Sequence, residues 1–323
     1  MRKKKSGKRI LLEIFLGVLV VINLINRYFQ AALTNKGRLD DRGHLYKWRF
    51  GSVYYMRYGS GSPLILLHEL GATGSGYEWH RIAERLAANH TVYVLDLPGC
   101  GRSAKPNLLY NSYLYVQLIN EFCRDVVQGR LPGQKIQLIT SGNAASFALL
   151  ATVFNKEMYE KVIMINPPLA KTMNRRAVFQ ETKMAKRLAR PALGMLIFNC
   201  FTNKRYIRKQ FKQLYYYHPE RVEEKDVEAF AEAAHLSGSA SRFLSSCIFE
   251  RTLNMDMKSA LRNSSAKLCV IVGEFDSEAD SRVNEYENAR EDIKLTIARG
   301  TKHLPHMEAP NMMSKIISRY TEE

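Results

Sequence analysis

One stretch of the sequence has the composition of a sharp turn that presents a reactive side chain. Residues 135–150 read KIQLITSGNAASFALL. A short apolar run, a cluster of small residues and then helical apolar spacing predict a strand, a turn and a helix. Enzymes hold a nucleophilic serine on such a turn in the pattern Gly-x-Ser-x-Gly. In that register Thr140 and Ala144 take the two glycine positions and Gly142 takes the nucleophile position. The turn is therefore expected without its hydroxyl.

Apolar runs alternate with helical patterns on both sides of this turn. Such alternation predicts an α/β fold whose mostly parallel sheet carries helices on both faces. The expected strands are a hairpin over 47–58 and single strands at 63–67, 91–95, 136–139, 162–165, 267–272 and 293–297. The expected helices span 77–88, 113–127, 147–154, 280–289 and 310–320.

A helical insertion interrupts the strand–helix alternation. Residues 171–251 contain no strong strand pattern but several helical stretches, including 205–217 and 227–236. This arrangement predicts a cap, or lid, over the carboxyl edge of the sheet. Between Lys171 and Tyr215 the insertion carries twelve Lys or Arg against one acid, which favours contact with an anionic surface.

The N-terminus predicts a membrane anchor. Residues 10–25 are mostly aliphatic, although they include Glu13 and Asn23. Sixteen residues are few for a span of roughly 20, but no small-x-small cleavage site follows, so a retained signal anchor is favoured over a cleaved signal peptide. The positive-inside rule predicts a single-pass cell-membrane protein whose main domain is extracytoplasmic. The preceding basic residues are Arg2, Lys3, Lys4, Lys5, Lys8 and Arg9.

Composition limits the classes of partner. The net charge is +17, and with an apolar N-terminus this charge favours an anionic membrane rather than nucleic acid, for which no motif is present. The five cysteines lack paired or metal-type spacing, so free thiols and no metal or cofactor site are expected. The expected division of the chain is 1–30 anchor, 31–45 linker, 46–170 first core part, 171–251 cap and 252–323 second core part.

Several motifs together resemble one superfamily. LILLHELGATGSGYEWHRIAERL, TVYVLDLPGCGRSAKP, VIVGEFD and TKHLPHMEAP occur here in the order and spacing of α/β-hydrolases. The capped branch that contains epoxide hydrolases, haloalkane dehalogenases and proline iminopeptidases is the most similar. The resemblance implies the α/β-hydrolase fold, with a helical cap, over residues 46–323.

The resemblance also implies site residues. The acid of the catalytic triad corresponds to Asp276 and the histidine to His303. The oxyanion donors correspond to the backbone N–H groups of Leu70 and Asn143. This chain departs from the family at Glu69, where a glycine normally follows the histidine of the oxyanion loop. A carboxylate there would bring negative charge to a hole that should stabilise it.

Glycine at position 142 leaves three functions open. Loss of the triad serine costs on the order of a millionfold in turnover, so acyl-enzyme chemistry at Gly142 is excluded. First, the chain is a non-catalytic relative that binds a lipid-like or anionic small molecule, or a partner. Second, His303 oriented by Asp276 acts as a general base on water or an acidic C–H. Third, Ser141 attacks an ester, lactone or epoxide after a one-residue shift of register, which would turn the strand's side chains over.

Overall fold

The computed structural model describes residues 7–34, 37–39, 42–175 and 183–322. Outside this part of the chain lie the basic residues Arg2, Lys3, Lys4 and Lys5 that precede the predicted anchor. The same holds for Arg176 and Glu181 of the predicted cap. The centre of the fold is an eight-stranded sheet in the order β1-β2-β4-β3-β5-β6-β7-β8. The strands are β1 His44–Trp48, β2 Gly51–Tyr58, β3 Ser62–Leu67, β4 His90–Leu95, β5 Ile136–Ser141, β6 Tyr159–Ile165, β7 Lys267–Gly273 and β8 Lys294–Ala298.

The sheet is mostly parallel, as predicted. Strands β3 to β8 run parallel to one another. At one edge β1 and β2 form an antiparallel hairpin, and β2 also pairs antiparallel with β4. Side chains of β3 alternate between two separate apolar clusters: Ile65 and Leu67 join one, and Leu64 and Leu66 join the other. Because both faces are covered, the strand is apolar along its whole length.

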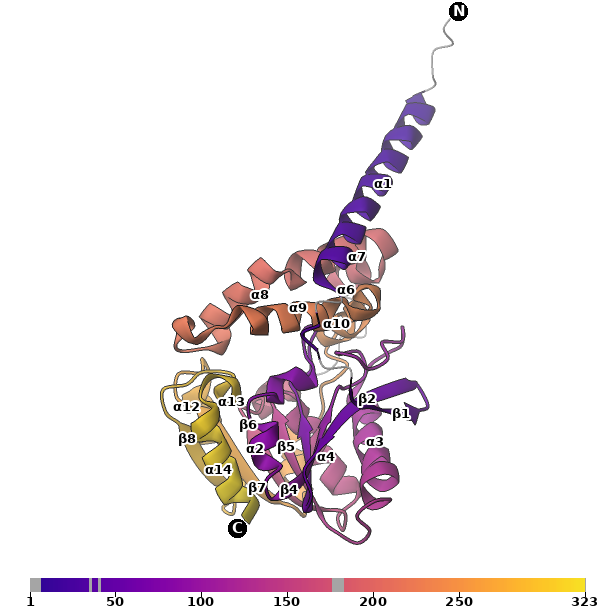
Figure 1. The fold of residues 1–323 in the computed structure, drawn as a ribbon. Helices are drawn as coiled ribbons and strands as arrows, with labels where there is room; N and C mark the ends of the chain where they lie inside the picture. Colours follow the sequence, from indigo (N-terminus) through magenta and orange to yellow (C-terminus); the bar gives the residue numbers. More distant parts are fainter. Residues whose placement is uncertain (1–6, 35–36, 40–41, 176–182, 323) are drawn as a thin grey trace, which may run out of the picture.

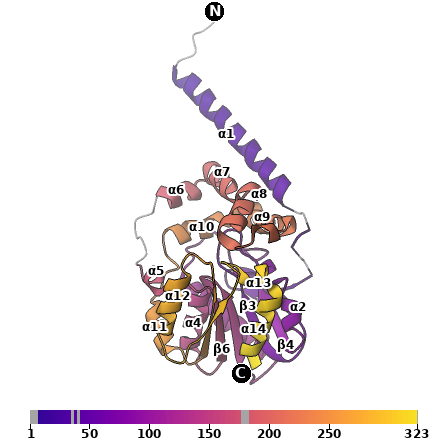
Figure 2. The same ribbon diagram turned by 90° about the vertical axis from the view of Figure 1, so that its left-hand side faces the viewer.

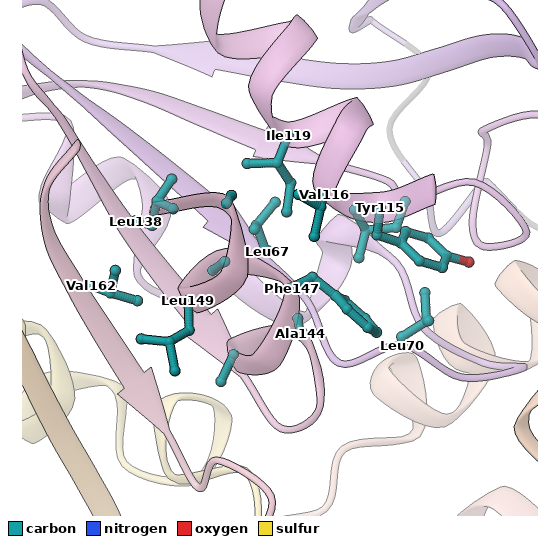
Figure 3. Packing of buried hydrophobic residues seen from close by; sticks show 14 of the residues in the cluster. Leu67, Leu70, Tyr115, Val116, Ile119, Leu138, Ala144, Phe147, Leu149 and Val162 are labelled. Carbon is teal, nitrogen blue, oxygen red and sulfur yellow. The ribbon is translucent and has the colours of Figure 1, made fainter. Parts of the chain in front are cut away.

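Helices cover both faces of the sheet (Figure 1). On one face α3 and α4 pack against the strands, and Figure 3 shows their side chains meeting those of the central strands. These core helices are α2 Ala83–Leu86, α3 Ser112–Phe122, α4 Ala144–Phe154, α11 Met257–Asn263, α12 Ala279–Glu287, α13 Pro305–Glu308 and α14 Pro310–Glu322. The prediction of one helix over 77–88 was wrong, because a 3-10 turn, η1 (Gly76–Trp79), and the short α2 occupy it.

Residues 183–249 of the predicted insertion form a layer of helices above the sheet's carboxyl edge, whereas residues 170–173 pack against the core (Figure 2). The helices of the insertion are α5 Ala170–Met173, α6 Lys183–Ala189, α7 Pro191–Thr202, α8 Lys204–Gln210, η3 Phe211–Tyr215, η4 Pro219–Arg221, α9 Glu224–Ser239 and α10 Arg242–Phe249. Helix α9 breaks near its end, where Ser237 and Gly238 have positive φ angles. The buried ammonium of Lys105, from the core, donates to the carbonyls of Ala233 (2.8 Å) and Leu236 (3.0 Å) beside this break.

The N-terminal segment is one long helix, α1 (Gly7–Leu33), which is 27 residues long and therefore about 40 Å in length. Its length and composition suffice to cross a membrane, and most of it projects away from the other elements (Figure 1). Only its last turns are buried. Asn26 donates to the carbonyl of Ala192 (3.0 Å) and accepts from Asn199 (2.9 Å), and Gln30 donates to the carbonyl of His235 (2.9 Å). Helix α1 is thus joined to α7 and α9.

Candidate functional site

The turn after β5 has the conformation that its sequence predicts. Gly142 has a φ of +53°, in the left-handed region that glycine adopts without strain. Its N–H donates to the carbonyl of Ile165 at 2.9 Å, which ties the turn to the neighbouring strand. Helix α4 begins two residues later, at Ala144. The backbone therefore keeps a strand–turn–helix geometry at the carboxyl edge of the sheet.

The side chain of Glu69 occupies the space above Gly142. A Cβ atom placed on residue 142 would lie 2.6 Å from Glu69 Oε1 and 2.7 Å from Glu69 Cδ. Real Cβ contacts are essentially never closer than 3.0 Å. A serine at position 142 and the present position of the Glu69 carboxylate are therefore incompatible. The carboxylate occupies the place where the reactive group of a serine hydrolase would stand.

Three side chains from different loops form a continuous hydrogen-bonded line. His303 donates from Nδ1 to Oδ2 of Asp276 (2.7 Å) and from Nε2 to Oε2 of Glu69 (3.0 Å). Asp276 follows β7, His303 follows β8 and Glu69 follows β3. Arg282 from α12 forms a buried ion pair with Asp276. The structure thus joins the predicted acid and histidine, and adds Glu69 where a serine would accept the third bond.

The two carboxylates hold His303 in its protonated form. Burial opposes the charge, but the negative charge of Glu69 and the hydrogen bonds to Asp276 and Glu69 outweigh it and raise the pKa of His303 to about 10. For Asp276, burial is likewise outweighed by the hydrogen bond from His303 and the charge of Arg282, so its pKa lies well below its usual range. The general-base prediction assumed a histidine pKa near neutrality, and this environment contradicts that assumption.

The backbone of Glu69 is fixed by a buried polar network. Its N–H donates to Oε2 of Glu78 (3.1 Å), and its carbonyl accepts from Nδ1 of His68 (2.8 Å). Glu78 is buried and its Oε1 accepts from Nε2 of His306 (2.9 Å). Burial would raise the pKa of Glu78, but His306 and other neighbours, among them the Ser141 hydroxyl, lower it. The loop that carries Glu69 therefore has a defined position beneath the cap.

Ser141 is buried beside Glu78, and its hydroxyl forms no hydrogen bond within the described part of the chain. It is the last residue of β5, pairs with Ile165 and is 1% exposed. Its register is the one that places Gly142 at the centre of the turn, so the one-residue shift required for a Ser141 nucleophile is not present. Ser141 is also absent from the described residues that line the large cavity.

The backbone N–H groups of Leu70 and Asn143 were predicted to bind an oxyanion, but the N–H of Leu70 already has a partner. The N–H of Leu70 donates to Oδ1 of Asn143 (2.8 Å), and Nδ2 of Asn143 donates to the carbonyl of Leu70 (3.0 Å). The side chain of Asn143 therefore satisfies both backbone groups of Leu70. One of the two expected donors is already engaged, and a substrate oxyanion would have to displace the Asn143 amide to reach it.

A cavity of about 660 Å³ lies between this site and the cap. Its floor includes Glu69, Asn143 and His303, and the cap supplies mostly apolar walls. The cap side chains are Met184, Leu188, Ile197, Phe198, Phe201, Thr202, Tyr206, Ile207, Gln210, Tyr215, Phe230, Ser245, Ile248 and Phe249. Apolar walls with a few polar groups at one end are typical of small-molecule sites.

The sequence identified Glu69 as a departure from the family pattern but indicated no role for it. The available signal was a double exchange: glycine is found where the family has its nucleophile, and a carboxylate is found where the family has glycine. No cluster of three or more His, Cys, Asp or Glu suited to a metal occurs within the described ranges.

Comparisons with known proteins agree with this fold. The chain matches the model of the alpha/beta hydrolase family over residues 64–313. It is 46% identical to a pimeloyl-[acyl-carrier protein] methyl ester esterase of Aeromonas salmonicida over 52 residues, 16% of this chain and 20% of that protein. It is 29% identical to a soluble epoxide hydrolase of a Corynebacterium species over 114 residues, 35% and 37% of the two chains. The matches thus span about a fifth to a third of these relatives.

Solved structures extend the similarity in fold. A serine hydrolase involved in carbazole degradation superposes with a TM-score of 0.69 and 14% identity, covering 87% of this chain and 98% of the other. A bacterial membrane phospholipase A superposes with a TM-score of 0.67 and 18% identity, covering 98% and 96%. The family match covers most of the sequence and includes β3, β5, β7 and the residues of the site. The chain belongs to the alpha/beta hydrolase family.

Proposed function

We propose that this protein is a membrane-anchored family member that binds a lipid-like molecule in the cavity beneath its cap and does not form an acyl-enzyme at position 142. The observation that carries this proposal is the exclusion of a side chain at Gly142 by the Glu69 carboxylate, 2.6 Å from the position of a Cβ. The apolar cavity is present although glycine, not serine, stands at position 142.

The charges of the site favour a neutral ligand over an anionic one. The Glu69 carboxylate lines the cavity and its side chain is 30% exposed. The protonated His303 at the floor already donates to Glu69 and Asp276, so an anionic head group would find both of its N–H groups engaged. A neutral head group with a hydroxyl or amide donor matches the carboxylate better, and the apolar cap walls accept a hydrocarbon chain.

Membrane attachment through α1 supports a ligand drawn from the bilayer. Phe201 of α7 and Phe249 of α10 line the cavity, yet they are 50% and 51% exposed. Both belong to the cap, whose α7 and α9 hold the end of α1. We place the cap against an anionic membrane surface, with its exposed basic residues near the lipid head groups. These residues are Lys183, Lys186, Arg187, Arg190, Arg205, Lys209 and Lys212. In line with the charge before α1, the main domain is extracytoplasmic.

The binding proposal can be tested with the full-length protein in lipid nanodiscs. A fluorescent monoacylglycerol is titrated into wild type and into Ile248→Trp, which fills part of the cavity. Leu109→Trp, at an exposed position of the core, is the matched control. Saturable binding that weakens only in Ile248→Trp is the expected result. Binding of equal strength in all three proteins would place the probe outside the cavity and contradict the proposal.

An enzymatic alternative has some support from the hydrolases among the relatives. The general-base version requires neutral His303, and the Ser141 version requires a hydroxyl that reaches the cavity. The charged state of His303 and the buried position of Ser141 favour neither. Esters, lactones and epoxides tested with wild type, His303→Ala and Ser141→Ala separate the two: loss in both variants indicates Ser141, and loss only in His303→Ala indicates the histidine.

A further inference from the structure

A second cavity lies at the side of the core, between α5, α11 and α12. This side cavity has a volume of about 410 Å³, and none of its described lining residues belongs to the cavity beneath the cap. Figure 2 shows the three helices close together below the cap. We propose that the side cavity is a binding site for a phosphorylated polyol, such as a sugar phosphate. This inference is independent of the ligand proposed for the cavity beneath the cap.

Three cationic side chains line the side cavity: Lys171 of α5, and Lys258 and Arg262 of α11. Lys258 and Arg262 are four positions apart, so they lie on one face of the helix, where like charges repel each other. All three residues are exposed, and no ion pair or side-chain hydrogen bond joins them to another residue of the described ranges. In the cap, by contrast, Lys204 and Arg208 form ion pairs with acids. The cations of the side cavity are therefore available to an anion.

A phosphate monoester matches this charge better than a carboxylate does. It carries about 1.5 to 2 negative charges near pH 7 and offers three acceptor oxygens. The guanidinium of Arg262 has the planar geometry that binds two such oxygens at once, and the ammonium groups of Lys171 and Lys258 act as point charges. Glu285 is the single acid among the described lining residues, so three positive charges are set against one negative charge.

Helix α12 supplies a polar wall that suits hydroxyl groups. Ser281, Asn284, Glu285 and Asn288 recur at a spacing of three or four residues, so they lie on one face of the helix and at its end. The carboxylate of Glu285 accepts a hydrogen bond from the N–H of Ala170, which holds it at the wall. Hydroxyl, amide and carboxylate groups are the hydrogen-bonding partners of polyol hydroxyls. The cations and this wall together match a ligand that carries both a phosphate and several hydroxyl groups.

The walls of the side cavity are fixed by the fold. Tyr286 of α12 donates to the carbonyl of Pro168 (2.9 Å), just before α5, and Arg290 donates to the carbonyl of Leu261 in α11 (3.1 Å). The side chains of Leu169 and Leu261 are buried and add apolar surface to the lining. Such surface packs against the carbon atoms of a sugar ring. A cavity whose helices are already joined loses little conformational freedom when a ligand binds.

Two kinds of molecule carry this chemistry: a free polyol phosphate and a lipid with a phosphorylated polyol head group. Helix α1 is bound to the cap, and the cap lies between the free end of α1 and the core (Figure 2). In the membrane-anchored orientation proposed above, the cap rather than the side cavity therefore faces the bilayer. A free polyol phosphate is the expected ligand.

The test is calorimetric titration of the full-length protein in phosphatidylcholine nanodiscs with glucose-6-phosphate. Saturable binding is expected, and glucose, which lacks the phosphate, is expected to bind at least tenfold more weakly. Lys258→Gln and Arg262→Gln should each weaken binding by about tenfold, the effect of losing a hydrogen bond to a charged group. Ser281→Trp fills the side cavity without a change of charge and should abolish binding. Lys135→Gln in the core and Lys209→Gln in the cap, both at exposed positions, are the matched controls.

Three results would overturn the inference. The first is the absence of saturable binding to wild type, and the second is equal affinity for glucose and glucose-6-phosphate. The third is an equal loss in the variants and in the controls, which would mean general attraction to a basic protein, or no loss in any of them. Ile248→Trp, in the cavity beneath the cap, is expected to bind glucose-6-phosphate as wild type does. Failure at one cavity is therefore distinguishable from failure at the other.

A second pair of nanodiscs identifies the source of the phosphate. One contains phosphatidylinositol phosphate, and the other contains phosphatidylglycerol at equal total charge. Equal affinity for glucose-6-phosphate in the two assigns the side cavity to a free molecule, as expected. Weaker binding only beside phosphatidylinositol phosphate means that the lipid head group competes for the side cavity, which would overturn the assignment to a free ligand.

Discussion

Glu69 and Gly142, 73 positions apart in the sequence, occupy one shared volume: the carboxylate of the first lies where the second would carry a side chain. The carboxylate reaches His303 only because residue 142 has no Cβ. Conversely, the glycine retains a turn with positive φ that the serine of other family members must adopt under strain. The two departures from the family pattern are therefore physically coupled, and this coupling can be measured.

Gly142→Ala is expected to destabilise the protein more than backbone strain alone explains. The new Cβ displaces Glu69 and breaks its bond to charged His303, a type of bond whose net worth is about 1.5 to 3 kcal/mol. Gly133→Ala is the matched control, because Gly133 has a φ of +75° but no atom within 4 Å of the new Cβ. Chemical denaturation of both variants, and of Gly142→Ala with Glu69→Ala, measures the coupling. Equal losses of unfolding free energy in Gly142→Ala and Gly133→Ala would contradict the coupling between Glu69 and Gly142.

Glu69→Gln is expected to lower the pKa of His303 and to flatten the dependence of stability on pH. The folded-state pKa of about 10 lies above the ordinary value of 6.5, so the protonated histidine stabilises the fold. This contribution is complete below about pH 6.5 and is lost as the pH rises through about 10. The free energy of unfolding, measured from pH 6 to pH 10, should therefore fall less in Glu69→Gln than in wild type.

NMR titration of His303 supplies the direct check on that variant. A His303 pKa that stays near 10 in Glu69→Gln would mean that Asp276 alone holds the proton, and the role given to Glu69 would be wrong.

Serine chemistry is expected to return only when both positions are exchanged. In Gly142→Ser alone the carboxylate blocks the hydroxyl, and in Glu69→Gly alone there is no nucleophile. The combined Gly142→Ser and Glu69→Gly variant frees Nε2 of His303 to accept the serine proton. Labelling by a fluorophosphonate is the measurement, with Ser141→Ala added to the combined variant as a control. Labelling of wild type that disappears in Ser141→Ala would instead favour the buried serine.

Exposed aromatic residues of the cap are expected to contact lipid. Tryptophan at Phe201 or Phe249 should be quenched by brominated lipids in nanodiscs, whereas tryptophan at Phe154, which is 58% exposed on the core, should not. The intact anchor is needed, since removal of the first 30 residues would delete buried Asn26 and its bonds to α7. Equal quenching at all three positions would contradict the proposed orientation of the cap.

Lys105 is expected to hold the cap against the core. Lys105 is 7% exposed, its ammonium donates to two carbonyls of α9, and burial lowers its pKa to about 8. Lys105→Met removes both bonds and leaves the carbonyls of a broken helix unsatisfied, which costs about 1 to 3 kcal/mol for each buried group. Hydrogen exchange in α9 should accelerate relative to wild type and to Lys156→Met, an exposed control.

Local patterns predicted the parts of the fold that depend on local physics. Apolar runs located the parallel strands, and the small residues around Gly142 located the turn, because hydrophobic periodicity and positive φ leave marks on neighbouring residues. The pairing of Asp276 with His303 came from resemblance, and the structure brings the two within 2.7 Å. The apolar spacing over 77–88 suited one continuous helix, but the segment is divided into η1 and α2, a break that the spacing does not mark.

The role of Glu69 could not be read from its own neighbourhood. Its charge next to an oxyanion loop was visible in the sequence, but the direction of its side chain depends on Gly142 and on His303, which come from two other loops. The engaged state of Leu70 depends in the same way on the side-chain amide of Asn143. Contacts between side chains of distant loops are set by tertiary packing, which no single stretch records.

Helix α1 is held by helices of the cap rather than by the sheet. Asn26 and Gln30 bind α7 and α9, and no hydrogen bond is recorded from the described part of α1 to a core strand. In the membrane-anchored arrangement that we propose, these bonds tie helices α7 and α9 of the cap to the membrane segment. A movement of the cap away from the core would then also move the core relative to the lipid, so we expect access to the cavity and the distance of the core from the membrane to change together.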